Sequence, residues 1–131
     1  MKSSKLHILI AEDDVDDGEI ILESFLKHAA FAVVDLVKNG KELIDFLKSA
    51  DNNKPDVILT DINMPILSGL DALREICDDI QLRTIPTFAY STSINPIYEA
   101  KCSQFGAKGY LVKPMNIKGF YDIPNKILAA L

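Results

Sequence analysis

The chain alternates between two hydrophobic periodicities over nearly its whole length, and this alternation restricts its fold more than any other feature. Short apolar runs of β type occur at Leu6–Ala11, Phe31–Val37, Asp56–Thr60, Ile85–Tyr90 and Gly109–Val112. The intervening and final stretches place apolar residues on one helical face, at 20–26, 43–47, 70–76, 97–105 and 123–131. Five strands that alternate with five helices predict an α/β fold, in which helices cover both faces of a parallel sheet.

Residues typical of helix ends support this assignment at the fourth helix and complicate it at the fifth. Asn95 followed by Pro96 is typical of a helix N-terminus, and Gly106 is typical of a helix stop. Pro124 instead falls inside the stretch expected to be the last helix. Because proline is tolerated only in the first turn of a helix, we expect this helix to kink or restart at residues 122–125.

Length and charge indicate one acidic domain. A chain of 131 residues is most simply a single domain, residues 1–131. The net charge of -5, without a cluster of Lys and Arg, argues against nucleic-acid binding. Residues 1–14 contain a short apolar run that meets three acids and has no small-residue cleavage site, so we expect no signal peptide, no membrane span and a cytoplasmic location.

Polar side chains follow four of the five predicted strands, at the point where each strand ends. They are Glu12 and Asp13 after the first strand, Asp61 and Asn63 after the third, Ser91 after the fourth, and Lys113 after the fifth. Because the carboxyl ends of parallel strands gather at one edge of a sheet, these side chains are expected to lie together. A binding or reactive site is therefore predicted at this edge.

Three of these residues are carboxylates, and their mutual repulsion has to be compensated. Two carboxylates about 4 Å apart repel by roughly 4 kcal/mol at an effective dielectric constant of about 20. A divalent cation relieves this repulsion, and Mg²⁺ is commonly held by one or two carboxylates. We therefore predict a Mg²⁺ site at Glu12, Asp13 and Asp61. The acids at residues 14–17 are assigned to the first turn of a helix, where they offset the helix dipole, with partner docking as the alternative.

Asp61 is the predicted reactive group. A lone aspartate before Asn and Pro would more commonly start a turn, since all three residue types are turn formers. Lys113, however, suits a phosphate as a compact charge with three donors, and Ser91 supplies one hydroxyl donor. Neither His7 nor His28 is placed to activate Ser91, which argues against a serine nucleophile. The residues favour phosphoryl transfer to Asp61, with Ser91 and Lys113 binding the phosphoryl group.

Four sequence motifs resemble one known family. They are ILIAEDD, DVILTDINMPILSGLDAL, IPTFAYSTS and GAKGYLVKP, in this order. Asp61 and Ser91 lie 30 positions apart, and Ser91 and Lys113 lie 22 apart. In motif order and spacing the chain resembles the receiver domain of two-component response regulators, from Leu6 to Leu131. The resemblance implies a flavodoxin-like, doubly wound sheet of five parallel strands in the order 2-1-3-4-5, with five helices.

The resemblance also implies the chemistry of the site. Asp61 would accept a phosphoryl group from a sensor histidine kinase or a histidine phosphotransfer protein. Asp13, Asp61 and the backbone carbonyl of Asn63 would bind Mg²⁺ directly, and Glu12 would act through water. The protein would not be an enzyme in the usual sense, because it would catalyse only its own phosphorylation and dephosphorylation.

A switch is implied by the same comparison. Ser91 matches the family's hydroxyl that binds the phosphoryl oxygens, and Lys113 matches the family's lysine. Tyr110 matches the aromatic residue of the switch, and the alternative for Tyr110 is an ordinary packed strand residue. Phosphorylation would draw Ser91 inward and let Tyr110 follow, which changes the partner-binding surface. We expect a monomer or a phosphorylation-dependent homodimer with an unknown downstream protein target.

Two other functions remain as alternatives. A phosphate-independent, receiver-like adaptor would keep the fold without using the pocket. A metal-dependent phosphatase with an aspartyl-phosphate is disfavoured because its Asp-x-Asp loop usually follows the first strand, whereas Asp61-x-Asn63 follows the third. The chain ends at Leu131, so we expect a stand-alone regulator, and residues 85–96 resemble receivers found beside phytochrome-type kinases.

Overall fold

The computed structural model describes residues 5–49, 54–93 and 95–131. The first four residues of the N-terminal segment, and position 94 in the 85–96 motif, lie outside the described residues. The sheet is parallel throughout, in the order β2-β1-β3-β4-β5. Its strands are β1 (Leu6–Ala11), β2 (Phe31–Val37), β3 (Val57–Asp61), β4 (Thr87–Ser91) and β5 (Gly109–Val112). The predicted doubly wound fold and its strand order are confirmed.

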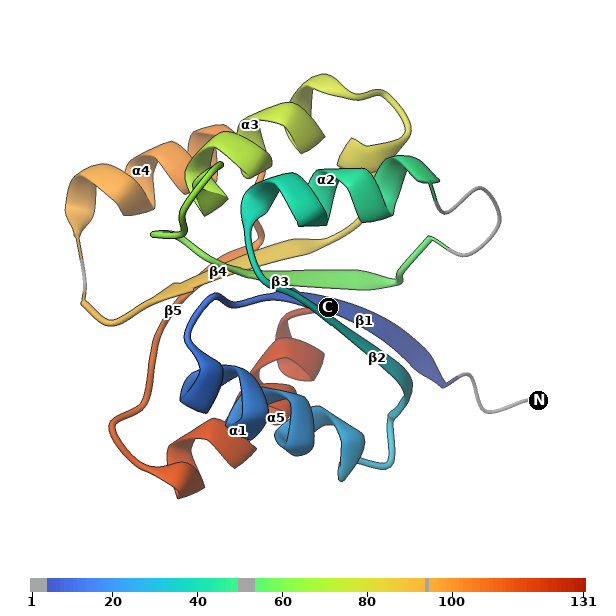
Figure 1. Cartoon of the computed structure of the whole chain (residues 1–131), viewed down its shortest axis with the longest axis vertical. Helices are drawn as coiled ribbons and strands as arrows, with labels where there is room; N and C mark the ends of the chain where they lie inside the picture. The colour runs from blue at the N-terminus through green and yellow to red at the C-terminus, as the bar shows by residue number, and fades with distance from the viewer. Residues whose placement is uncertain (1–4, 50–53, 94) are drawn as a thin grey trace.

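Two layers of helices enclose the sheet (Figure 1). One face is covered by α1 (Val15–Leu26) and α5 (Ile117–Ala130), and the other by α2 (Gly40–Ser49), α3 (Gly69–Asp78) and α4 (Pro96–Gln104). Alternate residues of β1 therefore enter different cores: Ile8 and Ile10 pack on the α1 and α5 side, whereas Leu9 and Ala11 pack on the α2 and α3 side. None of the helices in the described ranges combines the length and hydropathy needed to cross a membrane.

Side-chain caps fix where several helices begin. Asp14, Ser68, Asn95 and Asn116 each accept a hydrogen bond from a backbone N–H in the first turn of α1, α3, α4 and α5, respectively. The predicted start of α4 at Asn95 is thereby confirmed. Gly106, just beyond α4, has a φ of +86°, a conformation that glycine adopts without steric cost.

The boundaries of two strands, β3 and β4, differ from the sequence prediction. Strand β3 runs one residue further than predicted and contains Asp61, while β4 runs to Ser91. Strand β4 begins at Thr87 rather than Ile85, because Pro86 has no N–H to donate to the ladder and contributes only its carbonyl, which accepts from the Ile58 N–H. Both reactive candidates are therefore fixed within the sheet. A short 3₁₀ helix, η1 (Leu82–Thr84), was not predicted.

The last helix was expected to kink or restart at residues 122–125, and the expected restart is wrong. Helix α5 is continuous from Ile117 to Ala130 and contains Pro124 in its interior. Phe120 and Ile123 before the proline and Ile127 after it are all buried in the core shared with α1. This packing holds the turns on both sides of Pro124, so the missing N–H bond does not divide the helix.

The loop between β3 and α3 returns closely over the end of β3. The Gly69 N–H donates to the Ile62 carbonyl at 2.8 Å. A Cβ at position 69 would lie 1.7 Å from the Asp61 carbonyl oxygen, so only glycine fits there. The approach of Gly69 fixes the backbone around Asp61 and directs the loop back into α3.

Candidate functional site

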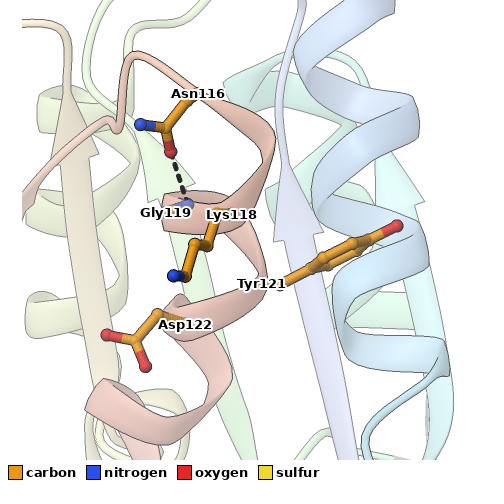
Figure 2. Close-up of a pocket in the computed structure, with 5 residues that line it drawn as sticks. All are labelled: Asn116, Lys118, Gly119, Tyr121 and Asp122. Atoms are coloured by element: carbon orange, nitrogen blue, oxygen red, sulfur yellow. Dashed lines mark hydrogen bonds between the residues drawn. The ribbon is translucent and has the colours of Figure 1, made fainter.

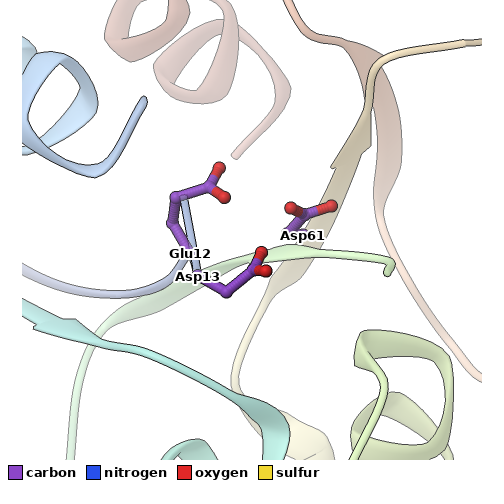
Figure 3. A group of neighbouring side chains, drawn as sticks. All are labelled: Glu12, Asp13 and Asp61. Carbon is purple, nitrogen blue, oxygen red and sulfur yellow. The ribbon is translucent and has the colours of Figure 1, made fainter. Parts of the chain in front are cut away.

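The predicted site residues meet at the edge of the sheet where the strands end, on the left in Figure 1. Glu12 and Asp13 follow β1, and Asp61 ends β3. One carboxylate oxygen of each lies within 4.8 Å of the others. Figure 3 shows the three carboxylates converging from these two strands. Glu12 and Asp61 are buried, whereas Asp13 is exposed, so the cluster opens to solvent on the Asp13 side.

Lys113 is buried among these acids. Its Nζ lies 2.8 Å from Glu12 Oε1 and 2.9 Å from Asp61 Oδ2. A third carboxylate, Asp17 at the start of α1, is 3.3 Å away. Only 6% of the Lys113 side chain is exposed, so the ammonium depends on these three carboxylates instead of water. Burial would lower the pKa of Lys113, but the hydrogen bonds to Glu12 and Asp61 raise it above its usual value.

Glu12 is completely buried and receives three donors. Besides Lys113, the Tyr90 hydroxyl donates to Glu12 Oε1 at 2.6 Å, and the Asp14 N–H donates to Oε2 at 3.1 Å. Burial by itself raises the pKa of Glu12, but the bonds from Lys113, Tyr90 and Asp14 outweigh it and lower that pKa below the usual range. The surroundings of Glu12 therefore favour its ionised form.

Asp61 lies in the opposite electrostatic situation. Burial and the nearby Glu12 charge raise its pKa to about 7, and the hydrogen bond from Lys113 offsets this only in part. A second donor, the Asn63 N–H, is 3.3 Å from Asp61 Oδ1. The pKa values of Asp61 and Glu12 shift in opposite directions because Glu12 accepts more and shorter hydrogen bonds than Asp61 does. Asp61 is left as the carboxylate that most needs a cation or another charge-neutralising group.

The donor set fits a hard divalent cation. Four ionised carboxylates, Glu12, Asp13, Asp17 and Asp61, against one lysine would leave an excess of three negative charges, of which a divalent ion would neutralise two. The available ligand atoms are all oxygens, as Mg²⁺ and Mn²⁺ prefer. Glu12 already accepts three hydrogen bonds, which leaves Asp13 and Asp61 as the carboxylates with more freedom to bind a metal.

The remaining predicted residues lie around this cluster. Ser91 is the buried last residue of β4, and its carbonyl accepts the Lys113 N–H at 2.7 Å. Asn63 is exposed in the loop after β3. Tyr110 is half-buried on β5, beside the apolar cluster between the sheet and α4, and its hydroxyl donates to the Ser93 carbonyl at 3.2 Å. Asn63 and Ser91 thus flank Asp61, while Tyr110 is one strand further along the sheet.

Two residues of the site were not singled out from the sequence. Asp17 was assigned to the helix dipole, with partner docking as the alternative. It does lie in the first turn of α1, but it also pairs with Lys113. Tyr90 was counted as an ordinary strand residue, yet it contacts both Glu12 and Lys113, whose Nζ is 5.0 Å from the ring centroid. The sequence offers no periodic signal for Asp17, because Asp13 lies before α1 and the backbone at Asp14 is extended, so helical spacing does not relate the two residues.

A separate hollow of about 420 Å³ lies on α5 and is lined by Asn116, Lys118, Gly119, Tyr121 and Asp122. Figure 2 shows that its lining comes from one helix and its N-cap, and that Asn116 caps the Gly119 N–H. It contains none of the predicted site residues. A hollow bordered by a single helix does not enclose a small molecule, so the chemistry lies at the carboxylate edge.

Comparisons with known proteins agree with this geometry. The chain is 32% identical over 110 residues to the polar-differentiation response regulator DivK of Brucella anthropi, covering 82% of this chain and 87% of DivK. It is 34% identical over 113 residues to the two-component response regulator-like protein APRR1 of Arabidopsis thaliana, covering 86% of this chain but only 18% of that longer protein.

Solved structures give the same result. The phosphorylated cyanobacterial phytochrome response regulator RcpA is 29% identical, with a TM-score of 0.87, and the match covers 95% of this chain and 91% of RcpA. The Mn²⁺-bound form of the response regulator Rcp1 has the same fold, with 24% identity, a TM-score of 0.84 and coverage of 95% and 92%. Residues 8–123 match the response regulator receiver domain, and the chain therefore belongs to this family.

Proposed function

We propose that residues 1–131 act as one receiver domain that accepts a phosphoryl group on Asp61 from a phosphohistidine donor. The observation that supports this most strongly is the position of Asp61, which lies between the carboxylates of the family's acidic pair and the buried Lys113 Nζ at 2.9 Å. The donor would be a sensor histidine kinase or a histidine phosphotransfer protein. The protein thus serves as a phosphoacceptor in signalling and promotes only its own phosphorylation and dephosphorylation.

The reaction requires Asp61 to be ionised. An Asp61 carboxylate oxygen attacks phosphorus, a phosphorus–oxygen bond forms, and the phosphorus–nitrogen bond to the donor histidine breaks. Lys113 offers an ammonium to the transferred group, and the Ser91 hydroxyl donates to one of its oxygens. Because Lys113 already contacts Asp61, it needs only a small movement to reach a phosphoryl group attached there.

Asp13, Asp61 and the Asn63 carbonyl would hold Mg²⁺, with Glu12 accepting from metal-bound water. When bound, the ion neutralises the negative charge that accumulates as phosphate approaches the carboxylates. Glu12 suits the indirect role because the Tyr90 hydroxyl, the Lys113 ammonium and the Asp14 N–H fix its carboxylate. Asp13 is exposed and can reach an entering ion first.

Phosphorylation would act on the surface formed by α4, β5 and α5. The phosphoryl group adds about -1.5 to -2 charge and strong acceptors to Asp61. Ser91 moves toward these acceptors. Tyr110 then gives up its hydrogen bond to the Ser93 carbonyl and fills the space that Ser91 has left. The change selects between two packings of β5 and α4 and so alters the affinity for a downstream protein.

The relatives support the wider context of this proposal. RcpA is a phytochrome response regulator of nearly the same length, solved in its phosphorylated form. We infer that this chain works as a cytoplasmic regulator of a two-component phosphorelay, as a monomer or a phosphorylation-dependent homodimer, without contact to nucleic acid or membrane. The acidic charge of -5 favours a basic protein surface over nucleic acid as the target.

Labelling with a small phosphodonor tests the proposal. Incubation with acetyl phosphate and Mg²⁺ should add one phosphate to the intact mass, and the addition should be absent in Asp61→Asn. Asp71→Asn, an exposed aspartate in the first turn of α3, is the matched control and should be labelled like wild type. Undiminished labelling of Asp61→Asn would show that the phosphoacceptor is elsewhere.

The alternative of a phosphate-independent adaptor makes the opposite prediction. Such a protein would take up no phosphate and bind its partner equally well with and without Mg²⁺ and phosphodonor. The combination of Asp61, Ser91 and Lys113 at one edge disfavours it, because an unused pocket has no need for a buried lysine among acids.

A further inference from the structure

Tyr90 occupies a position between the sheet core and the carboxylate cluster. Its side chain is completely buried, in the core beneath α1 and α5. Its backbone is paired with Asp61 in the β3–β4 register, and Ser91 follows it directly. The ring therefore belongs to the core, while the hydroxyl reaches Glu12 Oε1 at 2.6 Å.

Glu12 Oε1 is a shared acceptor. It takes the Tyr90 hydroxyl at 2.6 Å and the Lys113 Nζ at 2.8 Å, and the same Nζ contacts Asp61 at 2.9 Å. Lys113 consequently has to weaken its contact with Glu12 if it is to follow a phosphoryl group on Asp61. Without another donor, that movement would leave a buried carboxylate oxygen unsatisfied, which is unfavourable.

We propose that Tyr90 is a positioning residue for the phosphorylated state: its hydroxyl holds the Glu12 carboxylate so that Lys113 can transfer from Glu12 to the phosphoryl group on Asp61. This inference rests on the proposed function. Tyr90 touches neither the phosphoryl group nor the metal, and it acts through Glu12 and Lys113.

Two features of the structure favour this role over simple packing. The Tyr90 ring would fill the core equally well as phenylalanine, so packing alone does not require the hydroxyl. The ring also lies 5.0 Å from the Lys113 Nζ, a cation–π distance, and so provides a favourable surface along which the ammonium can shift. Both contacts involve the two residues whose interaction has to change on phosphorylation.

Beryllofluoride binding tests the inference, because beryllofluoride occupies the place of the phosphoryl group on Asp61. The affinity is measured by calorimetry at saturating Mg²⁺ for wild type, Tyr90→Phe, Glu12→Gln and the double variant. Tyr121→Phe is the matched control, since the Tyr121 hydroxyl also donates to a glutamate, Glu23, but on the surface between α1 and α5. Mg²⁺ affinity without beryllofluoride is measured in parallel.

Tyr90→Phe should weaken beryllofluoride binding by about tenfold or more, the effect typical of losing a bond to a buried charged group. Mg²⁺ affinity should change less, and Tyr121→Phe should match wild type. In the Glu12→Gln background the Tyr90→Phe effect should nearly disappear, because no buried carboxylate then depends on the hydroxyl.

The possible results separate this inference from the proposed function. A wild-type protein that binds no beryllofluoride would overturn both. Normal binding by wild type together with unchanged binding by Tyr90→Phe would overturn the role of Tyr90 alone. A Tyr90→Phe loss that persists in full in the Glu12→Gln background would show that the hydroxyl acts by another route, and would also overturn the inference.

Discussion

Asp61→Asn should stabilise the metal-free protein, and the gain should increase with pH. The folded protein raises the pKa of Asp61 from 3.8 to about 7, because of burial and the nearby Glu12 charge. A carboxyl whose folded pKa is raised contributes stability below its unfolded pKa and loses that contribution as the pH rises through the folded pKa. Asparagine has no proton to lose, so the variant avoids the loss while Lys113 keeps Glu12 and Asp17 as partners.

The size of the effect follows from the two pKa values. A rise of about three units in the pKa of Asp61 corresponds to about 4 kcal/mol of folding stability. The wild type loses all of this stability only above pH 7. At pH 5 less than half of this has been lost, so the difference in unfolding free energy between variant and wild type should grow by about 2–3 kcal/mol from pH 5 to pH 8.

Urea unfolding in a metal chelator at pH 5 and pH 8 measures this difference directly. Glu75→Gln, which removes the same charge from the exposed face of α3, should show almost no change with pH. Adding Mg²⁺ at pH 8 should stabilise the wild type more than Asp61→Asn, since the ion binds the ionised carboxylate. An Asp61→Asn gain that is equal at both pH values, or a wild type that is more stable at pH 8, would refute the raised pKa.

Three further predictions concern the metal, the lysine and the loop after β3. Asp13→Ala should weaken Mg²⁺ binding at least tenfold, because it removes a ligand. Asp14→Ala should instead lower the unfolding free energy by about 1 kcal/mol, because it removes the α1 cap. If both variants lose the same Mg²⁺ affinity in an NMR titration, the assignment of Asp13 as the ligand is wrong. Lys113→Ala should fold and bind beryllofluoride more weakly, with chemical-shift changes confined to the surroundings of Asp61; wild-type shifts along α4 would exclude Lys113 as the coupling residue. Gly69→Ala should lower the free energy of unfolding in urea by several kcal/mol, because its Cβ would lie 1.7 Å from the Asp61 carbonyl oxygen. The control Gly106→Ala has open space around its Cβ and should lose only about 1 kcal/mol, because of its positive φ.

The fold was predictable because its determinants are local and repeated. The order of apolar runs and helical faces defines four crossovers between the five strands, and right-handed crossover rules leave few sheet topologies. Local chemistry also fixed the start of α4 at Asn95. The error at α5 arose because proline was judged by its local cost alone. Burial of Phe120 and Ile127 on either side of Pro124 opposes that cost, and tertiary packing of this kind is not visible in a local pattern.

The site was predictable only as far as strand ends determine it. Parallel strands bring their last residues to one edge, so the meeting of Glu12, Asp13 and Asp61 followed from the sequence alone. Their functional roles stay predictions until labelling and metal titrations are done.

The contacts that set the charge state of this site depend on tertiary geometry. Asp17 reaches Lys113 from 96 positions away, which depends on how α1 is rotated about its own axis. Tyr90 reaches Glu12 from 78 positions away, which depends on which face of β4 meets the end of β1. Burial and the nearby Glu12 charge raise the pKa of Asp61 to about 7, whereas at Glu12 the bonds from Lys113 and Tyr90 outweigh burial and lower the pKa. A sequence pattern can thus identify the phosphoacceptor, but the relative acidity of the two buried carboxylates is determined by donors contributed from distant elements.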